Sequence, residues 1–229
     1  MAERASPSSR RIAFAPRLVI MAKSPGAGQV KRRLGASLGA VAACNVYRSC
    51  LAHTLRRLSV SPRWHTVLAI TPDADLAAPH WLRLAPTKSV ARLGQGRGDL
   101  GRRIQRLFAR LPPGPAIIIG SDIPGIRASH IAQAFRLLGA HDAVLGPAQD
   151  GGFWLVGLRR SPRLLAPFRS VRWSGPHALA DTLANLKGHR VALAATLCDI
   201  DTEEDYRRSR ESVQYLILPK NNSGSRQSA

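Results

Sequence analysis

A glycine-containing loop surrounded by cations is the first stretch of the sequence whose residue types could do chemistry. Residues 19–35 read VIMAKSPGAGQVKRRLG, an apolar run followed by a tight turn and a cluster of positive charge. Backbone amides in such a turn, and those that open a following helix, can receive phosphate oxygens while nearby cations offset their charge. The candidate phosphate-binding residues are Lys23, Ser24, Pro25, Gly26, Gly28, Lys31 and Arg33. A plain strand-to-helix turn with solvated lysines is the alternative for this loop.

Two familiar nucleotide-binding loops do not fit this stretch. A Walker P-loop ends in Gly-Lys-Ser/Thr, whereas Lys31 lies between Val30 and Arg32. A dinucleotide fingerprint needs a third glycine at the position of Lys31 and an acidic ribose partner about twenty residues later. The corresponding region, residues 44–55, reads CNVYRSCLAHTL and contains no acid.

Carboxylates at the ends of apolar runs are the candidate metal ligands. Asp122 follows the apolar run 116–120 in IIIGSDIPG, and Asp199 and Asp201 lie in CDIDTEED. Their hard oxygen atoms suit Mg²⁺ or Mn²⁺, which bridges phosphates. A cap or turn role remains open for each of the three, and the acidic residues 203–205 are expected to begin a helix.

Two further loops could contact substrate. In GPAQDGGFWLVGL, Asp150 is a candidate general base or acceptor contact, and Gly151 and Gly152 would let a ligand approach the backbone. A simple hairpin turn is the alternative. In GQGRGDLGRR, Gly98 and Asp99 could surround a nucleobase, or the loop could be flexible with Asp99 capping the next helix.

Alternating apolar and amphipathic segments must position these residues. Strands are predicted at 17–22, 65–70, 116–120, 142–146 and 153–158, and helices at 37–59, 99–111, 128–139 and 176–187. This alternation predicts a three-layer α/β/α fold with a mostly parallel sheet. The last two strands are too close for a helical crossover, so one antiparallel element is expected. In such sheets ligands bind outside the carboxyl ends of the strands, where the candidate loops fall.

Composition and charge limit the classes of partner. The net charge is +20, but the arginines are scattered and the few aromatic residues do not alternate with them, so nucleic acid is not the favoured partner. No apolar run reaches the ~18 residues of a membrane span. The three cysteines lack metal-type spacing and predict reduced thiols in a cytoplasmic protein. A single domain is expected over 17–218, between disordered tails at 1–16 and 219–229.

Six motifs in order along the chain resemble a known bacterial family. They are MAKSPGAGQVKRRL, GQGRGDLGRR, GSDIP, GPAQDGGFWLVGL, RWSGPHAL and DIDTEEDY, which together span about residues 17–208. The sequence resembles the GT-A-like transferases associated with radical-SAM and selenodomain proteins, some of which are named arsenosugar-biosynthesis glycosyltransferases. This family is related to molybdopterin and phospholactate guanylyltransferases.

The resemblance implies a nucleotide-diphospho-sugar transferase fold with Mg²⁺ or Mn²⁺ near Asp122. Lys23, Lys31 and Arg33 match basic positions of the family, whereas Arg32 stands where a threonine is usual. Two other departures, Phe153-Trp154 in place of tyrosines and Gly125 in place of a frequent acid, affect the expected substrate more than the fold.

The leading hypothesis is a metal-dependent transferase that uses a nucleotide-activated donor, a nucleotide sugar, with an unidentified small-molecule acceptor. Asp150 and Lys31 are the catalytic candidates. The alternative is a nucleotidyltransferase that joins an NTP to a phosphorylated acceptor and releases pyrophosphate. A third hypothesis, from another class, is a non-catalytic basic protein that binds nucleic acid or a partner.

Overall fold

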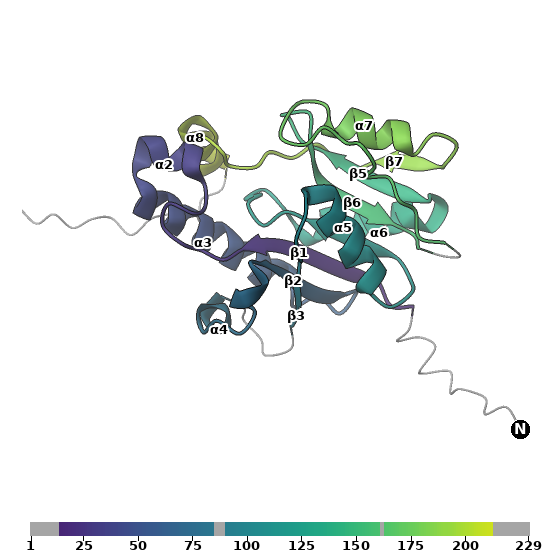
Figure 1. Cartoon of the computed structure of the whole chain (residues 1–229), viewed down its shortest axis with the longest axis horizontal. Coiled ribbons are helices and arrows are strands. Elements are labelled where there is room, and N and C mark those ends of the chain that lie inside the picture. Colours follow the sequence, from purple (N-terminus) through teal and green to yellow (C-terminus); the bar gives the residue numbers. More distant parts are fainter. Residues whose placement is uncertain (1–13, 85–89, 161–162, 213–229) are drawn as a thin grey trace, which may run out of the picture.

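A seven-stranded mixed sheet forms the centre of the molecule (Figure 1). The computed structural model describes residues 14–84, 90–160 and 163–212. The strands are β1 (Arg17–Lys23), β2 (His65–Thr71), β3 (Ala91–Gly94), β4 (Ala116–Ile119), β5 (Ala143–Pro147), β6 (Phe153–Leu158) and β7 (Val191–Leu193). They lie in the order β3-β2-β1-β4-β6-β5-β7.

The sheet is parallel except around β6. This strand runs antiparallel to both β4 and β5, with Ile119 opposite Leu155 and Leu145 opposite Val156. The predicted antiparallel pairing of the last two strands is therefore confirmed. The short edge strands β3 and β7, which pair in parallel with β2 and β5, were not predicted. Three or four residues carry too little periodicity to distinguish a strand from a loop.

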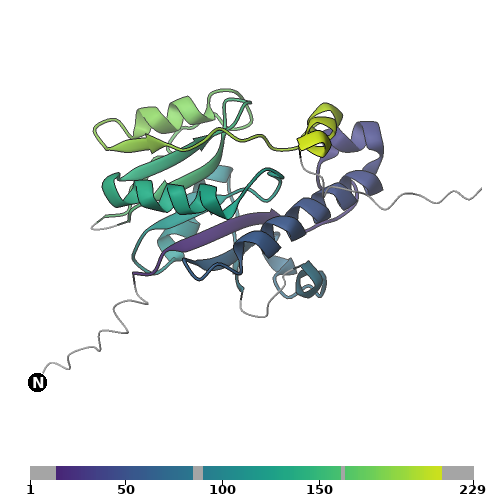
Figure 2. The same ribbon diagram turned by 180° about the vertical axis from the view of Figure 1, so that it is seen from behind.

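Helices cover both faces of the sheet. They are α2 (Arg32–Leu38), α3 (Ala40–Leu58), α4 (His80–Leu84), α5 (Leu100–Arg110), α6 (Ala128–Ala140), α7 (Ala178–Asn185) and α8 (Glu203–Ser212), with a 3₁₀ turn η1 at Asp73–Asp75. Figure 1 shows α5 in front of the sheet, and Figure 2 shows α3 and α6 in front of the opposite face. The three-layer α/β/α prediction is confirmed.

The helix predicted over 37–59 is wrong at its start. The structure has two helices here, α2 and α3, which meet at Gly39. Gly39 has a φ of 83°, a left-handed conformation that glycine adopts easily and that breaks the helix. The first helix therefore begins at Arg32, much nearer the cationic loop than the apolar pattern indicated.

Successive residues of a central strand pack into different hydrophobic clusters on the two faces of the sheet. On β1, Leu18 and Ile20 pack into the cluster that contains α3 and α6, while Val19 packs against α5. All three are fully buried, as expected of a central parallel strand. The predicted cap at Asp99 is confirmed, because its carboxylate accepts a hydrogen bond from the Arg102 amide at 2.7 Å. The helix start predicted at 203–205 is also present, and Thr202 Oγ1 accepts a hydrogen bond from the Asp205 amide there at 3.2 Å.

The single domain expected over 17–218 remains a prediction, and most of the two expected tails lies outside the described residues. Within the described ranges, no helix combines the length and the apolar character that crossing a bilayer requires.

Candidate active site

A pocket of about 540 Å³ opens at the carboxyl ends of β1 and β4. Its polar walls hold four cations and two carboxylates from segments far apart in the sequence: Lys23, Lys31, Arg32, Arg33, Asp122 and Asp201. Because β6 is antiparallel, its first residues, Phe153 and Trp154, reach the same edge and form an apolar wall. The predicted convergence of early cations and late acids is present in the structure.

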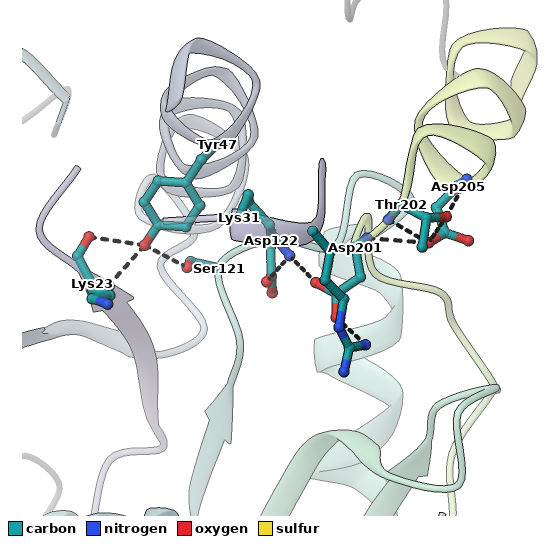
Figure 3. Close-up of polar contacts among 9 residues, drawn as sticks. Lys23, Lys31, Tyr47, Ser121, Asp122, Asp201, Thr202 and Asp205 are labelled. Carbon is teal, nitrogen blue, oxygen red and sulfur yellow. Dashed lines mark hydrogen bonds and ion pairs between the residues drawn. The ribbon is translucent and has the colours of Figure 1, made fainter. Parts of the chain in front are cut away.

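Lys31 lies at the centre of this convergence (Figure 3). Its Nζ donates to Asp122 Oδ2 at 2.5 Å and to Asp201 Oδ1 at 2.7 Å, and only 7% of its side chain is exposed. Burial alone lowers the pKa of the Lys31 ammonium, but the charges and hydrogen bonds of the two carboxylates raise it above its ordinary value. Lys31 is therefore a buried, permanently charged bridge between two carboxylates.

The backbone of Lys31 is strained. It precedes α2 with φ 48° and ψ 49°, a left-handed conformation that costs a residue such as lysine about 1–2 kcal/mol. Its ion pairs offset part of this cost. Arg33, the second residue of α2, is mostly exposed, and its Nη1 lies 3.9 Å from Asp201 Oδ2.

Asp122, Asp199 and Asp201 form a carboxylate triad. Each offers an oxygen, and these three oxygens lie within 4.8 Å of one another. The Ile200 amide donates to the Asp122 carbonyl at 3.2 Å, which fastens the segment carrying the two later acids to the loop after β4. Burial, followed by the charges of Asp122 and Asp201, raises the pKa of the Asp199 carboxyl to about 6.

The triad fits a divalent cation. Its donors are hard oxygens at mutual distances that one ion can span, and an ammonium group already lies against two of them. Sequence reasoning left open which of Asp199 and Asp201 would join Asp122, and the structure brings both to it.

Tyr47, on α3, braces the site and was missed by sequence reasoning. Its hydroxyl donates to the Lys23 carbonyl at 2.9 Å, accepts from the Lys23 amide at 2.8 Å and lies 3.2 Å from Ser121 Oγ (Figure 3). Burial raises the pKa of Tyr47 to about 12. The tyrosine thus joins the end of β1 to the loop that carries Asp122. A tyrosine inside an apolar helix face gives no sign in sequence of such a role.

Gln95 is a second unpredicted brace. Its side-chain amide donates to the Ala22 carbonyl at 3.1 Å and to the Ala69 carbonyl at 2.9 Å, so it joins the ends of β1 and β2 while lining the pocket. Sequence reasoning selected the GQG motif for its glycines and for Asp99 instead.

Residues 24–28 shape the loop between Lys23 and Lys31 without lining the pocket, whereas Gln29 and Val30 do line it. Ser24, Pro25, Gly26 and Gly28 are absent from the described pocket wall. Ser24 is buried and its Oγ lies 3.2 Å from His80 Nε2, on the side of α4. Lys23 Nζ donates to the Gln29 carbonyl at 2.7 Å, so both ends of the loop reach the pocket.

Gly98 and Asp99 also lie outside the described wall of this pocket. The Asp99 carboxylate is occupied as the cap of α5, and the Gly98 carbonyl accepts from Arg103 Nε at 2.8 Å. Leu100, the next residue, does line the pocket and is 43% exposed. This loop therefore positions α5 and the apolar side chain of Leu100.

Asp150 and Gly152 line an adjoining pocket of about 280 Å³, which shares Asp122 and Phe153 with the first. Asp150 Oδ1 accepts from the Gly152 amide at 2.9 Å, the hairpin-turn geometry expected as the alternative. At Gly151 (φ 82°) the backbone of Pro176 occupies the space beside the α-carbon. The Pro176 backbone therefore takes the space beside this glycine that was expected to admit a ligand.

The chain belongs to the bacterial family described as "Uncharacterized protein conserved in bacteria (DUF2064)", which matches residues 54–175. The matched segment contains Asp122 and the whole adjoining hairpin. No curated protein matches the chain by sequence.

Solved structures share the fold. A protein from Desulfovibrio desulfuricans G20 assigned as a nucleotide-diphospho-sugar transferase has a TM-score of 0.79 and 26% identity, over 94% of this chain and 92% of that one. A cytidylyltransferase from Leptospira borgpetersenii has a TM-score of 0.57 and 15% identity, over 90% and 89% of the two chains.

A third structure contains ligands. Glucosyl-3-phosphoglycerate synthase from Mycobacterium tuberculosis, solved with Mn²⁺, UDP and glucosyl-3-phosphoglycerate, has a TM-score of 0.54 and 8% identity, over 88% of this chain and 78% of that one. The fold of the DUF2064 chain is thus that of the nucleotide-diphospho-sugar transferases.

Proposed function

We propose that the protein is a metal-dependent transferase that uses a nucleotide-activated donor, a nucleotide sugar. The observation that carries the proposal is the carboxylate triad, bridged by Lys31, at the edge of a pocket lined by cations. The fold supports it, because the three similar structures described above are named as a nucleotide-diphospho-sugar transferase, a cytidylyltransferase and a glucosyl-3-phosphoglycerate synthase with bound UDP. We also propose a cytoplasmic location, which the reduced thiols predict. The association with radical-SAM and selenodomain proteins, which the sequence resemblance implies, is likewise a proposal.

The cationic pocket would hold the donor diphosphate. Lys23, Arg32 and Arg33 line it and offer positive charge to phosphate oxygens. Asp122, Asp199 and Asp201 would hold Mg²⁺ or Mn²⁺, which would offset the charge that develops on the departing nucleotide. The Mycobacterium tuberculosis synthase with Mn²⁺ and UDP supports this pairing of metal and nucleotide.

The adjoining pocket would hold the acceptor. An acceptor hydroxyl oxygen would bond to the anomeric carbon of the donor sugar, and the bond from that carbon to the nucleoside diphosphate would break. The electron pair would leave with the phosphate, and the hydroxyl proton would pass to a carboxylate. Asp150 is the candidate base, because one of its oxygens binds the Gly152 amide and the carboxylate lines this pocket.

Nucleotidyl transfer is the second candidate, and its support is the cytidylyltransferase among the similar structures. The same cations would then hold a triphosphate, and an acceptor phosphate would displace pyrophosphate. Release of pyrophosphate from an NTP, compared with release of nucleoside diphosphate from a nucleotide sugar, separates the two reactions.

A thermal-shift panel tests the proposal. Purified full-length protein is screened with UDP, GDP, CTP, UDP-glucose and GDP-mannose, each with Mn²⁺ and with EDTA. We expect at least one nucleotide to raise the melting temperature only with Mn²⁺, and Asp122→Asn to abolish that shift. Asp142→Asn is the control, since Asp142 lies outside the site and pairs with Arg190. No metal-dependent shift with any ligand would contradict the proposal. Steep salt-dependent RNA binding, unchanged by Asp122→Asn, would favour the nucleic-acid hypothesis.

A further inference from the structure

The two adjoining pockets differ sharply in charge. The larger one is lined by Lys23, Lys31 and two arginines. Among the described residues of the smaller one, the charged side chains are Asp122, Asp150 and Asp199, and none is positive. We propose that this smaller pocket, the acceptor pocket, binds a compound that has hydroxyl groups and an apolar face and carries no phosphate or carboxylate. The inference rests on the proposed function and narrows its acceptor class.

The nearest arginine in the sequence is already engaged. Arg172 precedes Trp173 in the pocket wall, and its Nε and Nη2 donate to the two oxygens of Asp181 at 3.0 and 2.8 Å. Its backbone amide donates to the same carboxylate at 2.9 Å. A bidentate ion pair therefore holds the guanidinium outside the pocket, and its donors are not available to an acceptor phosphate.

Aromatic and aliphatic side chains form the apolar wall. The rings of Phe153 and Trp173 meet edge to face, with centroids 6.0 Å apart, and the buried Phe168 ring packs against Trp173 with a centroid distance of 6.3 Å. Leu100 is 43% exposed and lines both pockets. A sugar ring or aglycone can pack on such a surface, and apolar walls with a few polar groups are typical of small-molecule sites.

The carboxylates suit hydroxyl donors. An ionised carboxylate only accepts hydrogen bonds, so Asp150, which lies outside the metal-binding triad, can bind hydroxyl groups but would repel an anionic substituent. Asp150 projects from the turn after β5 and is exposed, so it can reach a bound molecule. The anionic donor would thus bind in the larger pocket and the neutral, hydroxyl-bearing acceptor in the smaller one, and the two pockets meet at Asp122.

A matched pair of probes tests the inference without nucleotide or metal. Phenyl β-D-glucopyranoside and its 6-phosphate are titrated into the full-length protein in EDTA, and quenching of tryptophan fluorescence reports occupancy beside Trp173. We expect the neutral glycoside to bind at least tenfold more tightly, a difference of about 1.4 kcal/mol. In Asp150→Asn the preference should fall below threefold, while the asparagine carbonyl keeps the hydrogen bond from the Gly152 amide.

Asp142→Asn is the matched control. Asp142 also accepts from a backbone amide, that of Arg190 at 2.9 Å, but it precedes β5 at the opposite end of the strand, so its loss should leave the preference unchanged. Equal or tighter binding of the phosphate, or no binding of the glycoside up to 20 mM, overturns the inference. Because nucleotide binding is measured separately, a failure here is distinguishable from a failure of the proposed function.

Discussion

Replacing Lys31 with methionine is the most direct test of the site. Methionine keeps most of the length and the apolar stem of lysine but removes the ammonium that bridges Asp122 and Asp201. Without metal, the carboxylate triad would then lack its buried positive charge. We expect Lys31→Met to be less stable than wild type in EDTA and to bind Mn²⁺ more tightly, because the competing ammonium is gone.

The geometry gives the size of the effect. Lys31→Met removes the attraction between the ammonium and the two carboxylates, and opposite unit charges 2.7 Å apart, the separation of Lys31 Nζ and Asp201 Oδ1, attract by about 6 kcal/mol at an effective dielectric constant of 20. Solvent screens part of this attraction, since 29% of the Asp122 side chain and 43% of the Asp201 side chain are exposed, and the cost of desolvating the ammonium disappears in the variant. A loss of about 2 kcal/mol remains, which in a domain of this size lowers the melting temperature by about 4–8 °C.

Calorimetry in EDTA measures the stability loss, and the electron paramagnetic resonance signal of free Mn²⁺ measures metal affinity. We expect affinity to rise at least tenfold in Lys31→Met. Lys187 is exposed and lies two residues beyond the end of α7, so Lys187→Met removes the same charge away from the site and should change neither quantity. If Lys31→Met bound Mn²⁺ no more tightly than wild type, the ammonium would not compete with the metal for these carboxylates, and the reasoning would be refuted.

Three further changes have definite expected outcomes. Tyr47→Phe removes the hydroxyl that bonds to the Lys23 amide, the Lys23 carbonyl and Ser121 Oγ, and it should lower the free energy of unfolding in urea by about 1–3 kcal/mol. An unchanged free energy would mean that these hydrogen bonds do not stabilise the site. In EDTA, Asp199→Asn should stabilise the protein at pH 7 and lose that advantage near pH 4. The reason is that the folded-state pKa of Asp199, about 6, exceeds 3.8, so wild-type stability falls as pH rises between them. A pH-independent difference would contradict this. Gly101→Ala places a methyl group 2.8 Å from the Trp173 ring and should cost about 1–3 kcal/mol and shift the tryptophan emission spectrum; unchanged emission would mean that the ring does not move.

The central strands and the layer order could be predicted from sequence because they follow from apolar runs. Residues 116–120 and 153–158, for example, are apolar without interruption, and both form buried strands. The edge strands β3 and β7 could not be predicted, since they have three or four residues and are only partly buried. The break at Gly39 was missed because apolar spacing continues across it and only the backbone angle records it.

The candidate site was predicted as a set of charges but not as a geometry. The rule that ligands bind at the carboxyl ends of strands was enough to bring Lys31 and Asp122 to one edge. It could not show that Lys31 turns into a left-handed conformation and pairs with the acids, because the direction of its side chain depends on one strained residue. The glycines gave the weakest guidance: Gly151 accommodates the backbone of Pro176 instead of a ligand.

The position of Lys31 changes what the cationic loop can do. A lysine held between two carboxylates contributes little net charge to the pocket, so the attraction for a diphosphate must come from the other cations, of which Arg33 is 77% exposed. If a divalent cation takes the carboxylates, the same ammonium is released beside the phosphates that the cation attracts. Metal and donor would then favour each other's binding. The cation frees the Lys31 ammonium for the donor phosphates, and phosphates that bind the ammonium free the carboxylates for the cation. The coupling is reciprocal by linkage, so the Mn²⁺ affinity should rise with nucleotide bound by the same factor as the nucleotide affinity rises with Mn²⁺.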